Sequence, residues 1–353
     1  MSKFASLLGI RHPIVQAPMA GGITTPELVA EVSRAGALGS VGAAYMAPQA
    51  IEAICADIRA RTTAPFAVNL FAPQAPKPSS PDIAAENAPV LDALRAELGL
   101  PSGTEPPHVQ GLFEAQLDAV LRCRPAVFSF TFGLLAPEHL RALRAASIVV
   151  IGTATTVDEA VLLEEAGVEA ISAQGAEAGA HRGTFHGSFE DGLVGTMALV
   201  PQVAAHVRVP VLAAGGIMDG RGIAAARALG AAGAQLGTAF LGCPEAGISP
   251  AYRAALRSDA ALRTVVTRAF TGRPGRAIRN RFTEALEGRR TPPFPEQHRR
   301  TLDLRAAAAK QGRADLMLLW AGQGAPLVRP MPARALVEAL VREMWESWPG
   351  AAC

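Results

Sequence analysis

Short apolar runs recur along the first two-thirds of the chain, and each run is unbroken rather than alternating with polar residues. Eight such runs are present: Pro13–Ala17, Leu38–Gly42, Pro65–Leu70, Pro125–Phe130, Ile148–Gly152, Val168–Ala173, Val209–Ala214 and Ala234–Gly237. Unbroken apolar runs of this length are typical of strands buried on both faces of a parallel sheet. The pattern therefore predicts eight parallel strands.

Helical segments lie between most of these runs, and their ends carry recognisable capping residues. Thr25 precedes Pro26 at one helix start, and Gly36 follows that helix. Thr156–Glu159 has the spacing of a capping box, and Gly167 ends the helix that it begins. Eight strands that alternate with helices predict an α/β fold, namely a (β/α)8 TIM barrel.

The alternative fold is a doubly wound sheet that binds a dinucleotide. Its glycine-rich turn should follow the first strand, but that place holds Ala17–Gly22, which reads APMAGG. Gly36, Gly39 and Gly42 are evenly spaced and do not form a G-x-G-x-x-G motif. The barrel is the better prediction.

Two regions interrupt the alternation of strands and helices. Residues 72–107 are rich in Pro, Ser and Ala and predict an insertion after the third strand. Residues 242–315 follow the eighth strand and are rich in arginine, and they predict an inserted helical lid domain over the barrel mouth. Residues 1–241 and 316–353 would then form the barrel, with an amphipathic helix at Ala335–Trp345 packed back on it.

Composition narrows the range of partners. The net charge of the 353 residues is only +2, which does not suggest nucleic acid or a membrane surface as a partner. No apolar run has the length needed to span a membrane. The four cysteines, Cys55, Cys123, Cys243 and Cys353, lie far apart and predict reduced structural thiols. We expect a cytoplasmic protein, monomeric or homodimeric, that acts on a small molecule.

Glycine-rich turns follow three of the late strands. His181 lies in a loop of small residues after the run that ends at Ala173. Gly215 and Gly216 follow the next run, and Gly237 and Thr238 follow the last one. Because paired turns of this kind bind phosphate in barrel enzymes, the sequence predicts a phosphorylated ligand beside a histidine.

The other residues at the strand ends are small, neutral and polar. They include Asn69 and Gln174, whose amides both donate and accept hydrogen bonds and suit the edge of a heterocycle. The set contains no carboxylate pair, no cluster of metal ligands and no lysine for a Schiff base. The chemistry is therefore expected to belong to a cofactor, with no metal, and His181 is expected to handle a proton or polarise the substrate.

Taken together, these motifs resemble those of the class I nitronate monooxygenases, which are FMN-dependent barrel enzymes. The resemblance runs nearly end to end and rests on PIVQAPM (13–19), FAVNLF (66–71), SFTFG (129–133), AQGAEAGAHRGTF (173–185), VLAAGGI (211–217), QLGTAFL (235–241) and LWAGQ (319–323). It implies that His181 lies beside the flavin as the catalytic residue. The expected FMN-binding set is Pro18, Met19, Asn69, Gln174, Gly179, Gly215, Gly216, Gln235, Leu236, Gly237 and Thr238.

The lid segment carries the expected substrate end of the site. The resemblance places Phe294 and Lys310 near the substrate. The chain departs from the family pattern at Phe294 and His298, where an aromatic hydroxyl and an asparagine are expected, and at Ala180, where glycine is commoner.

The resemblance implies oxidation of alkyl nitronates, such as propionate 3-nitronate, with O2. The reaction would pass through an anionic flavosemiquinone and give a carbonyl compound and nitrite without NAD(P)H. One alternative is an NAD(P)H-dependent flavin reductase of the enoyl-acyl-carrier-protein or quinone reductase type, whose flavin would be bleached quickly by NADH under anaerobic conditions. Another is a barrel that binds a phosphorylated metabolite and no flavin.

Overall fold

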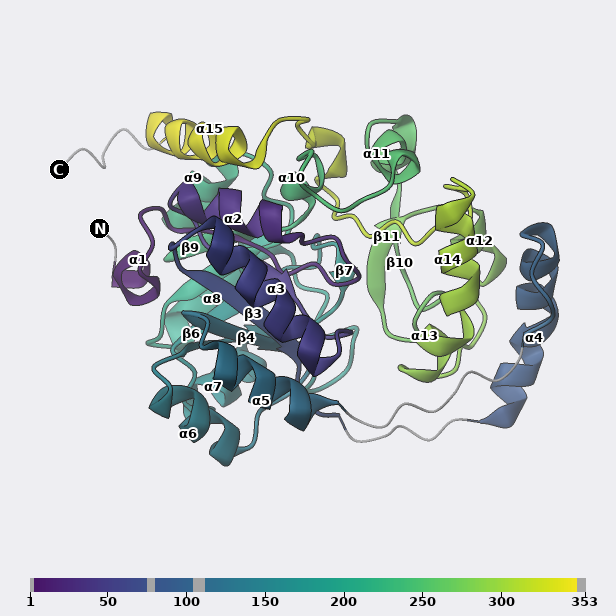
Figure 1. The fold of residues 1–353 in the computed structure, drawn as a ribbon, viewed down its shortest axis with the longest axis horizontal. Helices are drawn as coiled ribbons and strands as arrows, with labels where there is room; N and C mark the ends of the chain where they lie inside the picture. Colours follow the sequence, from purple (N-terminus) through teal and green to yellow (C-terminus); the bar gives the residue numbers. More distant parts are fainter. Residues whose placement is uncertain (1–2, 75–79, 104–111, 348–353) are drawn as a thin grey trace.

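A closed barrel of eight parallel strands forms the larger part of the molecule (Figure 1). The computed structural model describes residues 3–74, 80–103 and 112–347. The barrel strands are β1 (Ile14–Gln16), β2 (Gly39–Gly42), β3 (Phe66–Phe71), β4 (Val127–Thr131), β5 (Val149–Ala154), β6 (Ala170–Gln174), β8 (Val211–Ala214) and β9 (Gly233–Leu236). Their order is β1-β9-β8-β6-β5-β4-β3-β2, and hydrogen bonds from Gln16 to Leu38 and from Leu38 to Ile14 close the circle. The predicted (β/α)8 barrel is confirmed.

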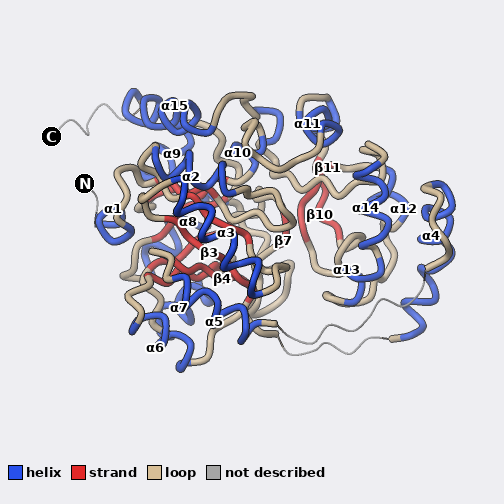
Figure 2. The backbone as a smooth tube through the Cα atoms, viewed as in Figure 1, coloured by secondary structure: helices blue, strands red, loops and turns tan. Residues whose placement is uncertain are grey.

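Helices surround the barrel and bury its outer face (Figure 2). They are α2 (Pro26–Arg34), α3 (Pro48–Arg61), α5 (Phe113–Cys123), α6 (Pro137–Ala145), α7 (Val157–Ala166), α8 (Thr196–His206), α9 (Gly220–Ala228) and α15 (Ala333–Glu346). The short α1 (Lys3–Leu8) places Phe4 and Leu8 in a buried cluster with strand residues Val15 and Val127. The opposite end of the barrel, where the strands terminate, is left for the site.

Two of the predicted helix starts have the expected side-chain cap. Thr25 caps α2 by accepting a hydrogen bond from the Leu28 N–H at 3.0 Å. Thr156 caps α7 in the same way, through the Glu159 N–H. The capping box predicted there is only half formed, because the Glu159 carboxylate accepts from Thr155 and from the loop after β7 instead of from Thr156.

The region after β9 is not purely helical, so that part of the prediction is wrong. It contains α10 (Thr238–Leu241), α11 (Pro250–Leu256), η1 (Asp259–Leu262), β10 (Thr264–Thr267), β11 (Gly275–Ile278), α12 (Arg281–Ala285), α13 (Glu296–Arg300), α14 (Leu302–Lys310) and η2 (Ala325–Leu327). Strands β10 and β11 form an antiparallel sheet with β7 (Ala180–His181), which belongs to the histidine loop. The β-branched run of residues 264–267 explains why this segment pairs as a strand.

A second buried core lies under this sheet and its helices. The insertion after β3 contributes to it through α4 (Pro81–Glu97), whose Leu91 and Leu94 belong to the same cluster as Phe270 and Phe282. Arg95 of α4 is only 5% exposed and donates to Asp303 of α14 at 2.7 Å. The insertion therefore packs against the region after β9.

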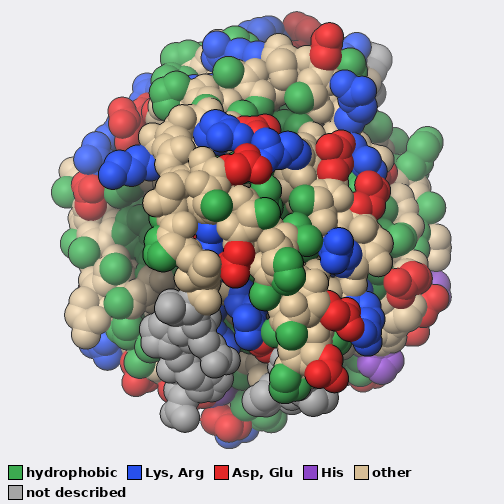
Figure 3. All heavy atoms as spheres, turned by 90° about the vertical axis from the view of Figure 1, so that its right-hand side faces the viewer, with side chains coloured by type: hydrophobic (Ala, Val, Ile, Leu, Met, Phe, Trp, Pro, Cys, Tyr) green, Lys and Arg blue, Asp and Glu red, His purple; other side chains and the backbone are tan. Residues whose placement is uncertain are grey.

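Charged side chains of both signs are interspersed with apolar and other groups on the outer face where α4 lies (Figure 3). Arg313 pairs with Asp315 at 2.8 Å, and Arg281 reaches both Glu97 and Asp315. These pairs tie α4 to α12 and to the turn after α14. Exposed pairs of this kind stabilise a fold only weakly, so the buried core beneath them holds the region together.

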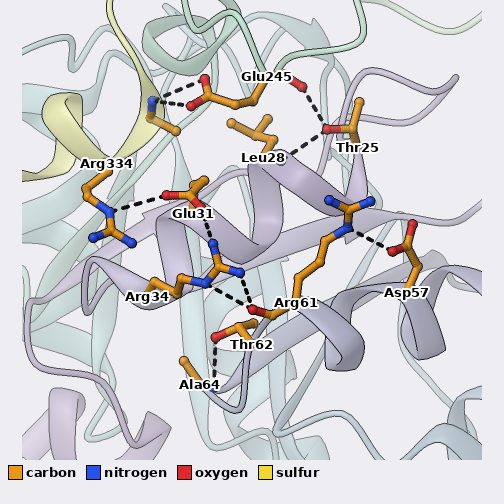
Figure 4. Close-up of polar contacts among 11 residues, drawn as sticks. Thr25, Leu28, Glu31, Arg34, Asp57, Arg61, Thr62, Ala64, Glu245 and Arg334 are labelled. Carbon is orange, nitrogen blue, oxygen red and sulfur yellow. Dashed lines mark hydrogen bonds and ion pairs between the residues drawn. The ribbon is translucent and has the colours of Figure 1, made fainter.

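Polar contacts also link α2 to the segment after β9 and to the start of α15 (Figure 4). Thr25 donates to the Glu245 carbonyl at 2.7 Å, and the Glu245 carboxylate accepts from the Ala333 N–H at 3.0 Å. Arg334 pairs with Glu31 of α2 at 3.3 Å. Segments from both ends of the chain thus meet on one side of the barrel.

Among the described residues, Cys55, Cys123 and Cys243 are buried and free, and Cys353 lies outside the described part of the chain. No helix of the described ranges is long and apolar enough to cross a membrane.

Candidate active site at the mouth of the barrel

An open cavity lies where the barrel strands end. Its walls are formed by Asn69 of β3, Thr131 of β4 and Gln174 of β6, together with the turns after β1, β8 and β9. The chain returns from the second region to complete the wall with Trp320 and Gly322. The site is therefore assembled from both parts of the molecule.

Most of the residues predicted from the sequence line this cavity. They are Pro18, Met19, Asn69, Gln174, Gly179, His181, Gly215, Gly216, Gln235, Gly237 and Thr238. Leu236 does not line it; its side chain is 1% exposed within the barrel and its carbonyl accepts from the Ala17 N–H at 2.8 Å. Phe294 stands beside the wall, with its ring centroid 5.9 Å from that of His181. Lys310 is exposed at the end of α14 and is not among the lining residues.

The glycine turns after β8 and β9 offer unused backbone donors. Gly215 and Gly216 have φ values of 126° and 70°, which favour glycine. Within the described part of the chain, the N–H groups of Gly216, Gly237 and Thr238 donate to no other residue. The Thr238 hydroxyl accepts from the Gly322 N–H at 2.9 Å. N–H groups without partners at one cavity wall suit an anionic oxygen ligand such as a phosphate.

Close backbone packing forms the floor between the two parts of the site. A Cβ atom added to Gly179 would come within 2.6 Å of the Gly322 nitrogen, and one added to Gly322 would come within 2.7 Å of the Glu177 carbonyl oxygen. Only glycine fits at these two places because the neighbours are backbone atoms that cannot turn away. The histidine loop is thereby held against the turn at 322.

The two predicted amide side chains have different surroundings. Asn69 donates to the Ser129 hydroxyl at 3.0 Å. Gln174 donates to the His181 carbonyl at 3.0 Å and accepts from the Gly183 N–H at 2.8 Å. Gln174 therefore orients the histidine loop in addition to lining the cavity.

His181 lies at the centre of an aromatic cluster. Its Nε2 atom is 2.8 Å from the Thr271 hydroxyl, on the turn between β10 and β11. Four rings surround the imidazole, with centroid distances of 5.1 Å to Trp320, 5.7 Å to Phe132, 5.9 Å to Phe294 and 6.3 Å to Phe71. These rings exclude water from one side of the histidine and restrict its rotation.

Burial and nearby cations keep His181 neutral. Burial lowers its pKa well below the usual value, and the charges of Arg273 and Arg305 lower it further. Burial also lowers the pKa of both arginines to about 10, so they remain charged at neutral pH. Two arginine charges thus act on an uncharged imidazole from outside the cavity lining, and such charges favour a bound anion.

Tyr45 forms the rim of the cavity near α13, and His298 and Arg305 lie next to Tyr45 without lining the cavity. Tyr45 stacks on His298 with a centroid distance of 4.7 Å and an interplanar angle of 13°. The Arg305 Nη2 atom lies 3.3 Å from His298 Nδ1, and Arg305 forms no ion pair within the described ranges. Burial, Arg305 and Arg299 lower the pKa of His298 to about 3, while burial raises that of Tyr45 to about 12.

Two buried charged residues anchor the loop that carries His181. Arg182 is 1% exposed and donates to the carbonyls of Gln174, Gly175 and Gly192. The Glu159 carboxylate accepts from the N–H groups that follow the loop, at residues 185 and 186, and from Thr155 at 2.5 Å. Arg182, which the sequence placed in a glycine-rich loop, is thus a structural cation.

Several lining or neighbouring residues did not stand out in the sequence. Thr271 and Arg273 lie in the segment TGRPG, whose glycines and proline mark a turn after the run at 264–267. These glycines and the proline predict a turn, but they do not indicate that the turn lies at the active site. Tyr45 and Trp320 carry no such local signal, because only the folded chain brings them to the cavity.

Comparison with known proteins agrees with this geometry. A sequence profile described as "Nitronate monooxygenase" matches residues 2–343. The chain is 44% identical to the nitronate monooxygenase of Pseudomonas aeruginosa, over 97% of this chain and 99% of that protein. It is 40% identical to a probable nitronate monooxygenase of Staphylococcus haemolyticus, over 97% of each.

Solved structures give the same picture. Nitroalkane oxidase from Streptomyces ansochromogenes superposes with a TM-score of 0.93 and 40% identity, over 99% of this chain and 100% of that one. FabK from Thermotoga maritima superposes with a TM-score of 0.77 and 29% identity, over 98% and 97%. The similarity to the nitroalkane oxidase is the stronger of these two.

Proposed function

Since the chain belongs to the nitronate monooxygenase family, we propose that it oxidises alkyl nitronates, such as propionate 3-nitronate, with O2 and with FMN as its cofactor. The observation that carries the proposal is the cavity itself: a neutral histidine and unused N–H groups line one space, and two arginine charges lie near the histidine. A nitronate is an anion, and these nearby arginines favour an anion over its neutral nitroalkane.

The residues present fit FMN at two ends of the cavity. The N–H groups of Gly216, Gly237 and Thr238 would hold its phosphate, since they lack other partners among the described residues. Asn69, Gln235 and the backbone near Met19 would bound its ring system on the side of β1, β3 and β9. The other proposed contacts are Pro18, Gln174, Gly179 and Gly215. Bound FMN would supply the one-electron redox chemistry between the nitronate and O2.

The protein side chains would bind the substrate, orient it and exclude water. His181 would polarise the nitro group or take a proton from a neutral nitroalkane, because its imidazole is uncharged at neutral pH. Phe71, Phe132 and Trp320 would shield the reacting carbon from solvent. Arg273 and Arg305 do not line the cavity, and their charges would act on the nitronate oxygens over a longer distance, as they do on His181.

Fewer residues are proposed to lie near the substrate than the sequence implied. Phe294 stays in it as a wall beside His181. We leave Lys310 out, because its exposed position at the end of α14 is not at the cavity wall. Leu236 is likewise proposed to support the strand rather than touch the cofactor. We further propose a cytoplasmic enzyme, monomeric or homodimeric.

The test is a measurement of nitrite release by the purified yellow protein with propionate 3-nitronate and O2, without NAD(P)H. Turnover under these conditions is expected. Rapid bleaching of the flavin by NADH under anaerobic conditions, with no nitrite release from the nitronate, would instead indicate a reductase like the FabK neighbour. A colourless protein that takes up no FMN would contradict the cofactor assignment.

A further inference from the structure

Thr271 makes the only side-chain hydrogen bond to the His181 ring within the described part of the chain. Its hydroxyl is 1% exposed and lies 2.8 Å from His181 Nε2. The same oxygen lies 3.2 Å from the Arg273 carbonyl oxygen and 3.3 Å from the Arg273 nitrogen. The Thr271 hydroxyl has one proton, which can be donated to only one of these acceptors. The direction of this donation decides which ring nitrogen of His181 carries a proton.

The Arg273 carbonyl favours one direction for the chain of hydrogen bonds. It accepts from no other described residue, so the Thr271 hydroxyl is its one donor there. If the hydroxyl pointed at His181 instead, that part-buried carbonyl would lose its only partner among the described residues, which has a cost in free energy. All groups are satisfied when Nε2–H donates to Thr271 and Thr271 donates to the Arg273 carbonyl.

The opposite ring nitrogen then carries a lone pair. His181 Nδ1 has no hydrogen-bond partner among the described residues, and it is not sealed away from the cavity that the residue lines. The rings of Phe132, Phe294 and Trp320 hinder a flip that would exchange the two nitrogens. The atom available to the substrate is therefore Nδ1.

We propose that Thr271 is a positioning residue that fixes His181 as the Nε2–H tautomer, so that Nδ1 accepts the proton of a neutral nitroalkane. The inference rests on the proposed function and deepens it. In this step the C–H bond beside the nitro group breaks, an N–H bond forms at Nδ1, and the electron pair stays on the substrate as the nitronate anion. A substrate supplied as the nitronate has already lost this proton and does not need the step.

The kinetic test compares Thr271→Val, which removes the hydroxyl at nearly constant shape, with Thr271→Ser, which restores it. With a neutral nitroalkane, Thr271→Val is expected to lower kcat/KM about ten- to a hundredfold. With the preformed nitronate the loss should stay below about threefold, and Thr271→Ser should recover most of the nitroalkane activity. Equal losses on both substrates would overturn the proposal, because a merely structural role would affect both.

A spectroscopic test needs no turnover. In protein labelled with 15N-histidine, the His181 signals are assigned from those that vanish in His181→Asn. We expect an unprotonated Nδ1 and a protonated Nε2 in the unsubstituted chain, and a mixture of tautomers in Thr271→Val. A protonated Nδ1 in the unsubstituted chain would refute the proposal. A protein could show the expected tautomer and yet oxidise neither the nitroalkane nor the nitronate. That result would refute the proposed function, and it would still support the positioning role of Thr271.

Discussion

The neutral state of His181 makes a prediction at the scale of a single residue. His181→Asn should lower kcat/KM with a neutral nitroalkane by about a hundredfold or more, because the proton acceptor is lost. The loss with a preformed nitronate should be much smaller. The measurement is nitrite release with both substrates at one pH. The control is His186→Asn, at an exposed position in the same loop, and equal losses for His181→Asn on both substrates would rule out the base role.

Arg305 makes a second prediction, about charge rather than proton transfer. Arg305→Met should raise KM for the nitronate anion by about tenfold and KM for the neutral nitroalkane by less than about twofold, because a charge acts on an anion and not on a neutral molecule. Arg305→Lys serves as the control, since it keeps the charge near His298. An equal rise in both KM values would show that the residue acts only through the structure of the rim.

At the scale of the elements, Glu159 joins α7 to the histidine loop and predicts a stability effect. Glu159→Gln removes a buried carboxylate that accepts from residues 155, 185 and 186, and should lower the free energy of unfolding by about 1–3 kcal/mol. Flavin affinity should fall with it. Glu165→Gln is the control, because Glu165 is exposed on the same helix. Matching denaturation midpoints for the two variants would contradict this anchoring role.

The barrel elements could be predicted from the sequence because each strand is a local apolar run, and helices lie between most of these runs. The second region could not be predicted as well, for a physical reason. Strand β7 has only two residues, and its partner β11 lies about ninety positions later in the chain. The pairing is set by tertiary contact, which leaves no periodic pattern to detect. The same holds for α4, whose apolar face packs on residues near 270.

The residues of the candidate site likewise divide into those that could be predicted from the sequence and those that could not. His181 and the turns at Gly215 and Gly237 could be found because strand ends in a barrel converge on one face. Tyr45, Thr271 and Trp320 could not, because each reaches the cavity only through packing of the second region or a distant loop. At Glu159 the local spacing predicted a capping box that the structure only half forms. The Glu159 carboxylate instead accepts a hydrogen bond from the distant His186 N–H.

At the scale of the whole molecule, the site depends on chain segments that are far apart in sequence. The links from Thr25 and Glu31 to Glu245 and Arg334 hold the first helices to the returning C-terminal segment (Figure 4). That segment begins beside Trp320 and Gly322, which line the cavity. The stability of the closed molecule and the shape of the site are therefore coupled, so conditions that loosen the fold should also weaken the site.

Acid provides such a condition, and histidines set the pH window in which it acts. The pKa values of His12, His181 and His298 are lowered in the folded state, that of His298 to about 3, whereas unfolded histidine titrates near 6.5. Below about pH 6.5 the unfolded chain binds more protons than the folded one, so stability falls as the pH falls. The lowered pKa values of Asp92, Asp219 and Asp315 add to this only near pH 4 and below, because their ordinary value is 3.8.

The thermal midpoint should therefore drop between pH 7 and pH 5, with each neutral buried histidine contributing up to about 1.4 kcal/mol per pH unit. His298→Gln removes one such group and should make the drop smaller, although it loses the stacking on Tyr45 at every pH. His206→Gln, at an exposed position on α8, is the control and should leave the drop unchanged. If His298→Gln and His206→Gln showed the same pH dependence as the unsubstituted chain, burial of a neutral His298 would not be the source of the acid sensitivity.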